Sequence, residues 1–315
     1  MAPDIQKQLS HYLWVEKYRP LSVDDMILPK SYKEFFLNII KDGQIPNLLL
    51  YSSTPGSGKT TIAKAICYDL DATYRYINIS SQGGIDTLRN DIQKFASMKS
   101  FDGKPKIVIC DEADGASPQF QAAMRATIEE FSRSCRFIFT CNFITKIIPA
   151  IKSRCQVFDF NMTENSIAEE IKPEIISRLS GILDFEEIQY KQETINKIVE
   201  SYFPDIRNMI SLCQKYSKMN KCIDENIFTF DSVDDEFYNF ILEKKFRKSR
   251  EYLIQKNYNY SELFRELFDN LIPKLDSSKQ GQVILIIGEY MHRHATAIDP
   301  EINAACCLYE IMATI

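Results

Sequence analysis

Five short apolar runs between residues 47 and 160 constrain the fold of this 315-residue chain more than any other feature. A helix-length segment separates each run from the next. Runs this apolar are typical of strands that are buried on both faces, and their alternation with helices is typical of a parallel sheet. The sequence therefore predicts an α/β core whose strands are NLLLY (47–51), YRYINI (74–79), KIVIC (106–110), RFIFTC (136–141) and QVFDF (156–160).

After residue 160 the strand-like runs stop and the pattern becomes helical. Apolar residues recur at helical spacing in segments 166–180 and 192–201, and again in segments 262–271 and 282–290. An acidic stretch, 224–236, separates the two pairs and predicts a solvated connector. We therefore expect the sheet to be followed by helical domains.

The composition excludes several classes of protein. The formal net charge of -5 gives no global support for nucleic-acid binding, so any such binding needs a local basic track. Apolar runs such as 283–287 are too short to span a bilayer and no secretory signal opens the chain, so we expect an intracellular protein without a membrane partner. The nine cysteines form no C-x-x-C pair, which argues against a zinc module and favours reduced thiols. The three dispersed histidines provide no histidine-based centre.

The stretch SSTPGSGKTT (52–61) matches the phosphate-loop pattern G-x-x-x-x-G-K-[ST] except that Ser53 replaces the first glycine. It follows a predicted strand and opens a predicted helix at Lys59, a context in which backbone N–H groups face phosphates. We expect Lys59 to reach the β- and γ-phosphates and the Thr60 hydroxyl to bind magnesium; the alternative is a glycine-containing turn that binds nothing. The expected nucleotide-binding residues of this stretch are Thr54, Pro55, Gly56, Ser57, Gly58, Lys59, Thr60 and Thr61.

Two carboxylates, Asp111 and Glu112, follow the third predicted strand. We expect Asp111 to hold Mg²⁺, directly or through water. We expect Glu112 to orient and polarise the attacking water, because phosphoryl transfer depends on positioning and charge stabilisation. Taken alone, the pair also fits capping or solubility groups at a strand end. Beside the phosphate loop, it predicts an NTPase.

Asn142 and Arg154 each leave two interpretations open. Asn142 ends the fourth predicted strand, where its amide either holds the lytic water or the γ-phosphate, or caps a turn. Arg154 precedes the fifth strand and is either an exposed salt-bridge arginine or a finger presented to the phosphate of another subunit. Spacing along the sequence does not choose between these roles.

The order of several motifs is similar to that in AAA+ sliding-clamp loader ATPases. The resemblance covers residues 12–160 strongly and continues through FPDIR (203–207). Within the family, the chain looks most like the ATPase ("large") subunit of T4-type bacteriophage loaders, with replication factor C small subunits as the close alternative. The motifs are WVEKYRP (14–20), PGSGKTT (55–61), GIDTLR (84–89), DEAD (111–114), CNF (141–143) and SRC (153–155).

The resemblance implies an architecture and an assembly. It implies a RecA-like AAA+ parallel-sheet ATPase domain (1–160), a small helical lid (161–228) and an all-α collar that mediates oligomerisation (229–315). It implies ATP and Mg²⁺ as cofactors. In the phage type, four copies of the ATPase subunit join one different small subunit, and the five subunits form a spiral around primer-template DNA.

The resemblance also implies roles for residues at the nucleotide. Asp111 and Glu112 correspond to the Walker B pair, Asn142 to sensor 1, Arg207 to sensor 2 of the lid, and Arg154 to the finger that acts on a neighbour's nucleotide. The N-terminal segment contributes three more residues that border the nucleotide, although Tyr18 is equally explained as an aromatic packing anchor. These three are Glu16, Tyr18 and Arg19.

Two basic residues, Arg89 and Lys146, match positions that face DNA inside the spiral. Contacts from such residues to phosphates give affinity without sequence information, which suits action at any primer end. The alternative for each is a solvated surface charge. Lys152 departs from the glutamine that commonly precedes SRC in relatives.

The implied function is that of a DNA-dependent ATPase in replication. ATP shared between Lys59 of one subunit and Arg154 of the next would assemble the spiral that opens a sliding clamp and binds DNA, and hydrolysis would release the closed clamp on DNA. Two alternatives stay open: another AAA+ DNA remodeller, such as a helicase loader or branch-migration motor, and a non-hydrolysing structural subunit. The protein would work in the bacterial cytoplasm if phage-encoded, or in a nucleus if it is a eukaryotic replication factor C subunit.

Overall fold

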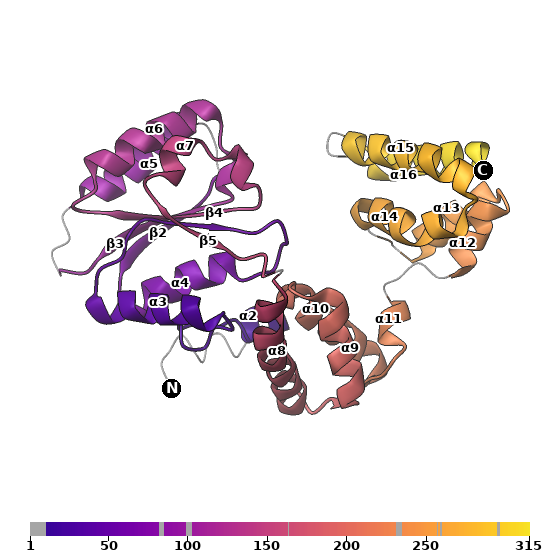
Figure 1. Cartoon of the computed structure of the whole chain (residues 1–315), viewed down its shortest axis with the longest axis horizontal. Coiled ribbons are helices and arrows are strands. Elements are labelled where there is room, and N and C mark those ends of the chain that lie inside the picture. The colour runs from indigo at the N-terminus through magenta and orange to yellow at the C-terminus, as the bar shows by residue number, and fades with distance from the viewer. Residues whose placement is uncertain are drawn as a thin grey trace. The chain divides into compact units, whose positions relative to one another are not determined.

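The computed structural model describes residues 11–81, 85–98, 103–162, 164–230, 235–256, 258, 260–294 and 297–315. The chain forms two compact units, which divide between Asp224 and Glu225. The sheet and the first helical region belong to the first unit, and the remaining helices belong to the second (Figure 1). The division of the first unit into an ATPase domain and a lid, and the boundary at residue 228, remain predictions.

The first unit contains one parallel five-stranded sheet in the order β2-β3-β4-β1-β5. Each predicted strand is confirmed, with its ends within one residue of those expected. This order places the end of β1 between the ends of β4 and β5, so the loop after β1 emerges from an interior strand of the sheet and not from its edge. The strands are β1 (Leu48–Tyr51), β2 (Thr73–Asn78), β3 (Lys106–Asp111), β4 (Arg136–Cys141) and β5 (Gln156–Asp159).

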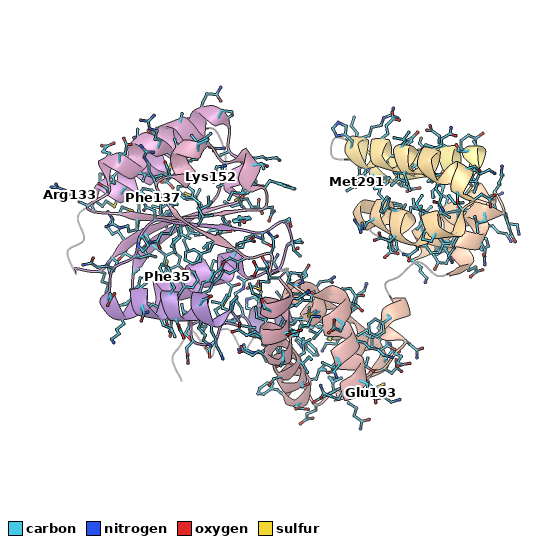
Figure 2. All side chains as sticks on the ribbon, in the orientation of Figure 1. Phe35, Arg133, Phe137, Lys152, Glu193 and Met291 are labelled. Atoms are coloured by element: carbon cyan, nitrogen blue, oxygen red, sulfur yellow. The ribbon has the colours of Figure 1, made fainter. Side chains whose placement is uncertain are left out.

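Helices cover both faces of the sheet (Figure 1). On one face, the Phe35 ring of α3 packs against the Phe158 ring of β5 in a tilted arrangement, with 4.9 Å between ring centroids. On the other, Phe137 of β4 joins a buried cluster with Ile92 and Met124; Figure 2 labels Phe35 and Phe137. Burial from both sides explains why the strands read as continuous apolar runs. The helices are α3 (Lys30–Asp42) and α4 (Lys59–Asp69) on the first face, and α5 (Ile85–Ser97), α6 (Pro118–Glu130) and α7 (Pro149–Lys152) on the second.

The helical part of the first unit follows β5. It consists of α8 (Asn165–Phe185), α9 (Gln192–Tyr202) and α10 (Ile206–Asn220), together with two short strands, β6 (Gln189–Tyr190) and β7 (Cys222–Ile223). The expectation that strands end at residue 160 was wrong here, because β6 and β7 pair in parallel. Strands of two residues are too short to leave an apolar run in the sequence.

The N-terminal segment, residues 12–19, packs on these helices. The Trp14 side chain is buried, and the Trp14 N–H donates to Gln214 Oε1 of α10 at 3.0 Å. Gln214 Nε2 donates in turn to the carbonyl of Tyr12 at 2.7 Å. Tyr18 OH donates to Glu186, just after α8, at 2.6 Å. The segment, which includes α2 (Trp14–Lys17), is therefore attached to both α8 and α10.

The second unit is helical in the part of it that is described. The buried side chains of Phe237, Phe264, Ile287 and Leu308 bring four of its helices into one core. None of the helices in the described ranges of the chain is both long and apolar enough to cross a membrane. The helices of this unit are α11 (Ile227–Phe230), α12 (Asp235–Leu242), α13 (Phe246–Gln255), α14 (Tyr260–Glu266) with a π-helical turn (Leu267–Leu271) and a 3-10 turn (Ile272–Lys274), α15 (Ser277–His294) and α16 (Pro300–Thr314).

Candidate functional site

A cavity of about 390 Å³ lies in the first unit, beside the carboxyl ends of β1, β3 and β4. Loops at this edge of a parallel sheet are the usual position of ligand sites in α/β folds. The cavity brings together residues expected to act at one site but far apart in sequence. These are Tyr18, Arg19, residues 55–61, Asp111, Glu112, Asn142 and Arg207.

The loop between β1 and α4 has the conformation that phosphate binding requires. Gly56 and Gly58 have φ of 70° and 92°, in the left-handed region that favours glycine. Lys59, the first residue of α4, donates from Nζ to the carbonyls of Ser52 and Thr54, both at 3.2 Å. Burial lowers the pKa of Lys59. The loop, the helix N-terminus and this ammonium group are groups of the kind that bind anions, and the structure brings them together.

Ser53 does not disturb the loop. It is not among the described residues with positive φ, so the backbone at this position does not need glycine. Its N–H and its hydroxyl both donate to Asn161 Oδ1, each at 2.8 Å. The departure from the phosphate-loop pattern therefore changes a side-chain contact and not the backbone conformation.

Asp111, at the end of β3, is held by hydroxyl groups. The Thr60 hydroxyl donates to Oδ1 at 2.8 Å, the Tyr76 hydroxyl donates to Oδ2 at 2.6 Å, and Thr140 also donates to Oδ1. Burial, aided by the bond to Asp111, raises the pKa of Tyr76 to about 12. Thr60 and Asp111 thus present a hydroxyl and a carboxylate side by side, and such hard oxygen donors suit Mg²⁺.

Glu112 directly follows β3 with φ of 55°, an uncommon conformation for a non-glycine residue. Its N–H donates to Thr140 Oγ1 at 3.1 Å, which contributes to fixing this turn. The Ser80 hydroxyl lies within hydrogen-bond distance of the Glu112 carboxylate and of Asn78 Oδ1, the latter at 2.8 Å, and its single hydrogen can be donated to either. Glu112 lines the cavity and is exposed, which is compatible with the expected contact to water.

The helices after the sheet close one side of the cavity. Asp205 caps α10 by accepting from the N–H of Asn208 at 3.0 Å, and Arg207 lies in the first turn of that helix. Gly56 of the phosphate loop lies so close to this helix start that a Cβ added to it would be 1.8 Å from Asp205 Oδ1. Arg178 of α8 also lines the cavity and donates from Nη2 to the Asp25 carbonyl at 2.6 Å.

Other predicted residues are not among the described residues that line the cavity. Glu16 pairs with Arg19, with 2.7 Å between Oε1 and Nη2, and Thr54 contributes its carbonyl to Lys59. Lys146 is exposed, with its Nζ 4.9 Å from the centroid of the Phe143 ring. Arg89 belongs to α5, but its side chain lies outside the described residues.

Arg154 is also not among the described residues that line the cavity. Its Nε donates to Glu129 Oε1 at 2.9 Å, and its Nη1 donates to the carbonyl of Ala150 at 2.7 Å. The ion pair with Arg154 lowers the pKa of Glu129. Lys152, shown in Figure 2, donates to the carbonyl of Ile144 at 3.3 Å.

Sequence reasoning missed several residues of the cavity. Tyr76 and Thr140 lie near the ends of β2 and β4, on either side of β3, so their positions in predicted strands carried a usable signal. Arg178, Ile206 and Ile210 come from α8 and α10, and only the packing of these helices on the loop brings them to the cavity.

Comparison with known proteins agrees with this geometry. Residues 49–162 match the model of the family "ATPase family associated with various cellular activities (AAA)". The chain is 31% identical to the sliding-clamp-loader large subunit of Enterobacteria phage T4, over 92% of each chain. It is 32% identical to the replication factor C small subunit of the archaeon Sulfurisphaera tokodaii, over 95% of this chain and 94% of that protein.

Solved structures support the fold. The RuvB Holliday junction branch migration motor of Thermotoga maritima aligns with a TM-score of 0.56 and 17% identity, over 78% of this chain and 87% of that one. At this identity the likeness concerns the fold alone. The closer sequence matches confirm the resemblance seen in the motifs, and the chain belongs to the AAA ATPase family, in the group of sliding-clamp-loader large subunits and replication factor C small subunits.

Proposed function

We propose that this protein is the ATPase subunit of a sliding-clamp loader and that it binds ATP with Mg²⁺ in the cavity of the first unit. The observation that carries the proposal is the convergence of the phosphate loop, the Asp111–Glu112 pair, Asn142 and Arg207 on that one cavity. Phosphoryl transfer needs these groups together, because catalysis consists of positioning and charge stabilisation.

The loop and Asp111 hold the triphosphate and its metal. Lys59 turns from the carbonyls of Ser52 and Thr54 to the β- and γ-phosphates, and the N–H groups at the start of α4 bind phosphate oxygens. Thr60 and Asp111 hold Mg²⁺, which supplies charge neutralisation at the phosphates when bound.

Three further residues act at the γ-phosphate. Glu112 orients and polarises the attacking water, and Asn142 positions that water or the γ-phosphate. Arg207 enters from the first turn of α10 and contributes positive charge. Because Arg207 belongs to a helix outside the sheet, its contact with phosphate links nucleotide binding to the position of α10.

Arg154 acts on the nucleotide of a neighbouring subunit. Arg154 is not among the described residues that line its own cavity, and it is bonded to Glu129 at the protein surface; both observations support this role. The T4 relative is named as a large subunit of a clamp loader, so the proposed partners are a sliding clamp and primer-template DNA. Arg89 and Lys146 contact DNA phosphates.

The proposed assembly is a pentamer of four copies of this chain and one different small subunit. Loss of the γ-phosphate on hydrolysis removes the contact between neighbours and releases the closed clamp on DNA. The relatives named above come from a bacteriophage and an archaeon, and we place this protein in the cytoplasm of a bacterial host.

The first test is steady-state ATP hydrolysis by the purified complex, alone and with primer-template DNA and the cognate clamp. We expect DNA and clamp together to raise the rate sharply, and Glu112→Gln and Arg154→Ala each to abolish it. Arg133→Ala is the control. Arg133 is an exposed arginine of the first unit (Figure 2) and is not one of the described lining residues of the cavity, so its replacement should leave the rate unchanged. Absent hydrolysis would favour a structural subunit, and hydrolysis indifferent to clamp and Arg154 would favour another remodeller.

A mixing experiment tests the action of Arg154 between subunits. Complexes that contain only Lys59→Ala or only Arg154→Ala chains should be inactive. A mixture of the two should recover part of the activity, because some interfaces then combine an intact Lys59 with an intact Arg154. An inactive mixture would show that Arg154 acts within its own subunit.

A further inference from the structure

Asn161 makes a set of contacts to the phosphate loop that the proposed function does not use. It lies in the short segment between β5 and α8, far from the loop in sequence. Its side-chain oxygen accepts from the N–H and from the hydroxyl of Ser53, each at 2.8 Å. Ser53 is the one loop residue that departs from the phosphate-loop pattern, so the departure has a specific partner.

The orientation of the Asn161 amide is fixed by its neighbours. The backbone N–H of Ser53 can only donate, so the side-chain carbonyl oxygen must face it. On the other side, Asn161 Nδ2 donates to Asp159 Oδ1 at 2.7 Å, and the Asn161 N–H donates to the same oxygen at 2.8 Å. The Tyr51 hydroxyl donates to Asp159 Oδ2 at 2.8 Å. Asn161 is thus held on the end of β5 and presents one acceptor to the loop.

The contact lies next to the two carbonyls that bind Lys59. The carbonyls on either side of Ser53, those of Ser52 and Thr54, are the two that accept from Lys59 Nζ. Ser52 is fully buried, and its hydroxyl accepts from the Thr54 N–H at 3.2 Å, so the backbone here is constrained from both sides. Fixing Ser53 therefore fixes the two carbonyls that hold the Lys59 ammonium group.

We infer that Asn161 is a positioning residue for the phosphate loop, and that Ser53 and Asn161 form a functional pair. Asn161 holds the first turn of the loop in its binding conformation, and it does so from the segment that leads into α8. The loop and the start of α8 are thereby connected through a side chain as well as through the chain itself. This inference rests on the proposed binding of ATP at the loop.

The test measures affinity for a slowly hydrolysed ATP analogue with Mg²⁺ by fluorescence titration, on Ser53→Ala, Asn161→Ala and the double variant. Since Ser53→Ala removes one hydrogen bond, it should weaken binding about two- to fivefold. Asn161→Ala removes the acceptor of the Ser53 N–H, of the Ser53 hydroxyl and of the Ser52 hydroxyl, so it should weaken binding about five- to thirtyfold. The double variant should match Asn161→Ala, because the hydroxyl has no partner once the amide is gone. A purely structural role would lower the thermal stability of the variants without non-additive losses of affinity for the analogue.

Tyr51→Phe is the matched control. It removes a hydrogen bond to Asp159 in the same network without touching Ser53, and it should leave the affinity within about twofold of wild type. If Asn161→Ala does not fold, Ser53→Ala alone still tests the pair, since Ser53 is exposed and its backbone tolerates alanine. Wild-type affinity in Asn161→Ala overturns the inference, and so does wild-type affinity in Ser53→Ala if only that variant folds. Additive losses of affinity in the double variant also overturn it. Wild-type protein that fails to bind the analogue, as Lys59→Ala should, instead overturns the proposed function and the inference with it.

Discussion

Position 56 requires glycine for two reasons, its positive φ and its close approach to α10, and replacement by alanine tests both. Gly56 has φ of 70°, and an alanine in this left-handed region costs about 1–2 kcal/mol. In addition, the new Cβ would lie 1.8 Å from Asp205 Oδ1 and 2.9 Å from Arg207 Cβ, distances that no real contact has. Either the loop or the start of α10 must move.

The control for the first of these costs is Gly43→Ala. Gly43 ends α3 with φ of 65°, and nothing lies within 4 Å of its virtual Cβ, so only the backbone strain applies. Because 1 kcal/mol corresponds to about 2–4 °C in a domain of this size, we expect Gly43→Ala to lower the Tm by about 2–8 °C. Gly56→Ala should lose about 2–4 °C more, because displacing Asp205 also removes the cap of α10.

Nucleotide affinity distinguishes the two variants further. Displacement of α10 carries Arg207 away from the cavity, and loss of one charge-assisted hydrogen bond weakens binding about 10- to 100-fold. Gly43 is remote from the cavity lining, so Gly43→Ala should bind the ATP analogue as wild type does. The measurements are thermal unfolding by circular dichroism and titration with the analogue. Equal losses of Tm and of affinity in the two variants would refute the close packing of α10 on the loop.

Three further predictions concern single contacts. Tyr76→Phe removes the hydroxyl that holds Asp111, so the Mg²⁺ concentration for half-maximal binding of the analogue should rise about tenfold, and an unchanged value would exclude Tyr76 from metal binding. Burial raises the pKa of Asp205, so the wild type loses stability as the pH rises through this folded pKa. Asp205→Asn keeps a capping oxygen without the charge; its Tm should exceed that of wild type at pH 7, and the difference should close towards about pH 4. Gln214→Ala leaves the N–H of Trp14 buried without its acceptor, which costs about 1–3 kcal/mol and should increase hydrogen exchange in residues 12–19; unchanged exchange there would contradict the attachment of this segment to α10.

The sheet was predictable because each strand carries its own signal. The stretches 48–50 and 107–110 are apolar at every position, as burial on both faces demands, and their prediction needed no knowledge of the rest of the chain. The same holds for Lys59 and Asp111, since a phosphate loop and a strand-end carboxylate are local patterns. Local patterns of this kind were sufficient to predict the part of the site formed by Lys59 and Asp111.

The rest of the cavity depends on packing between distant segments. Arg178 reaches it because α8 lies beside residues 25–27, and no periodicity in α8 distinguishes that arginine from any other exposed charge. The partner of Ser53 was equally hidden, because Asn161 is an ordinary linker residue until β1 and β5 are neighbours in the sheet. Sheet order is a property of the whole fold, and the sequence of either strand does not contain it.

Two contacts connect the phosphate loop with the segments that follow the sheet, and a third attaches the N-terminal side of the cavity to the same helices. Gly56 packs against Asp205 at the start of α10, Ser53 is bonded to Asn161 before α8, and the N-terminal segment that lines the cavity is attached to α10 through Gln214. A change in any one of these shifts groups that bear on the other two, so the loop and the helices cannot adopt their binding positions independently. A nucleotide that contacts both the loop and Arg207 therefore favours one arrangement of the loop relative to α10. The free energy by which it favours that arrangement cannot exceed the difference between its binding free energies in the two arrangements. In an assembly of such subunits, that difference is the free energy available to hold neighbours together before hydrolysis and to release them afterwards.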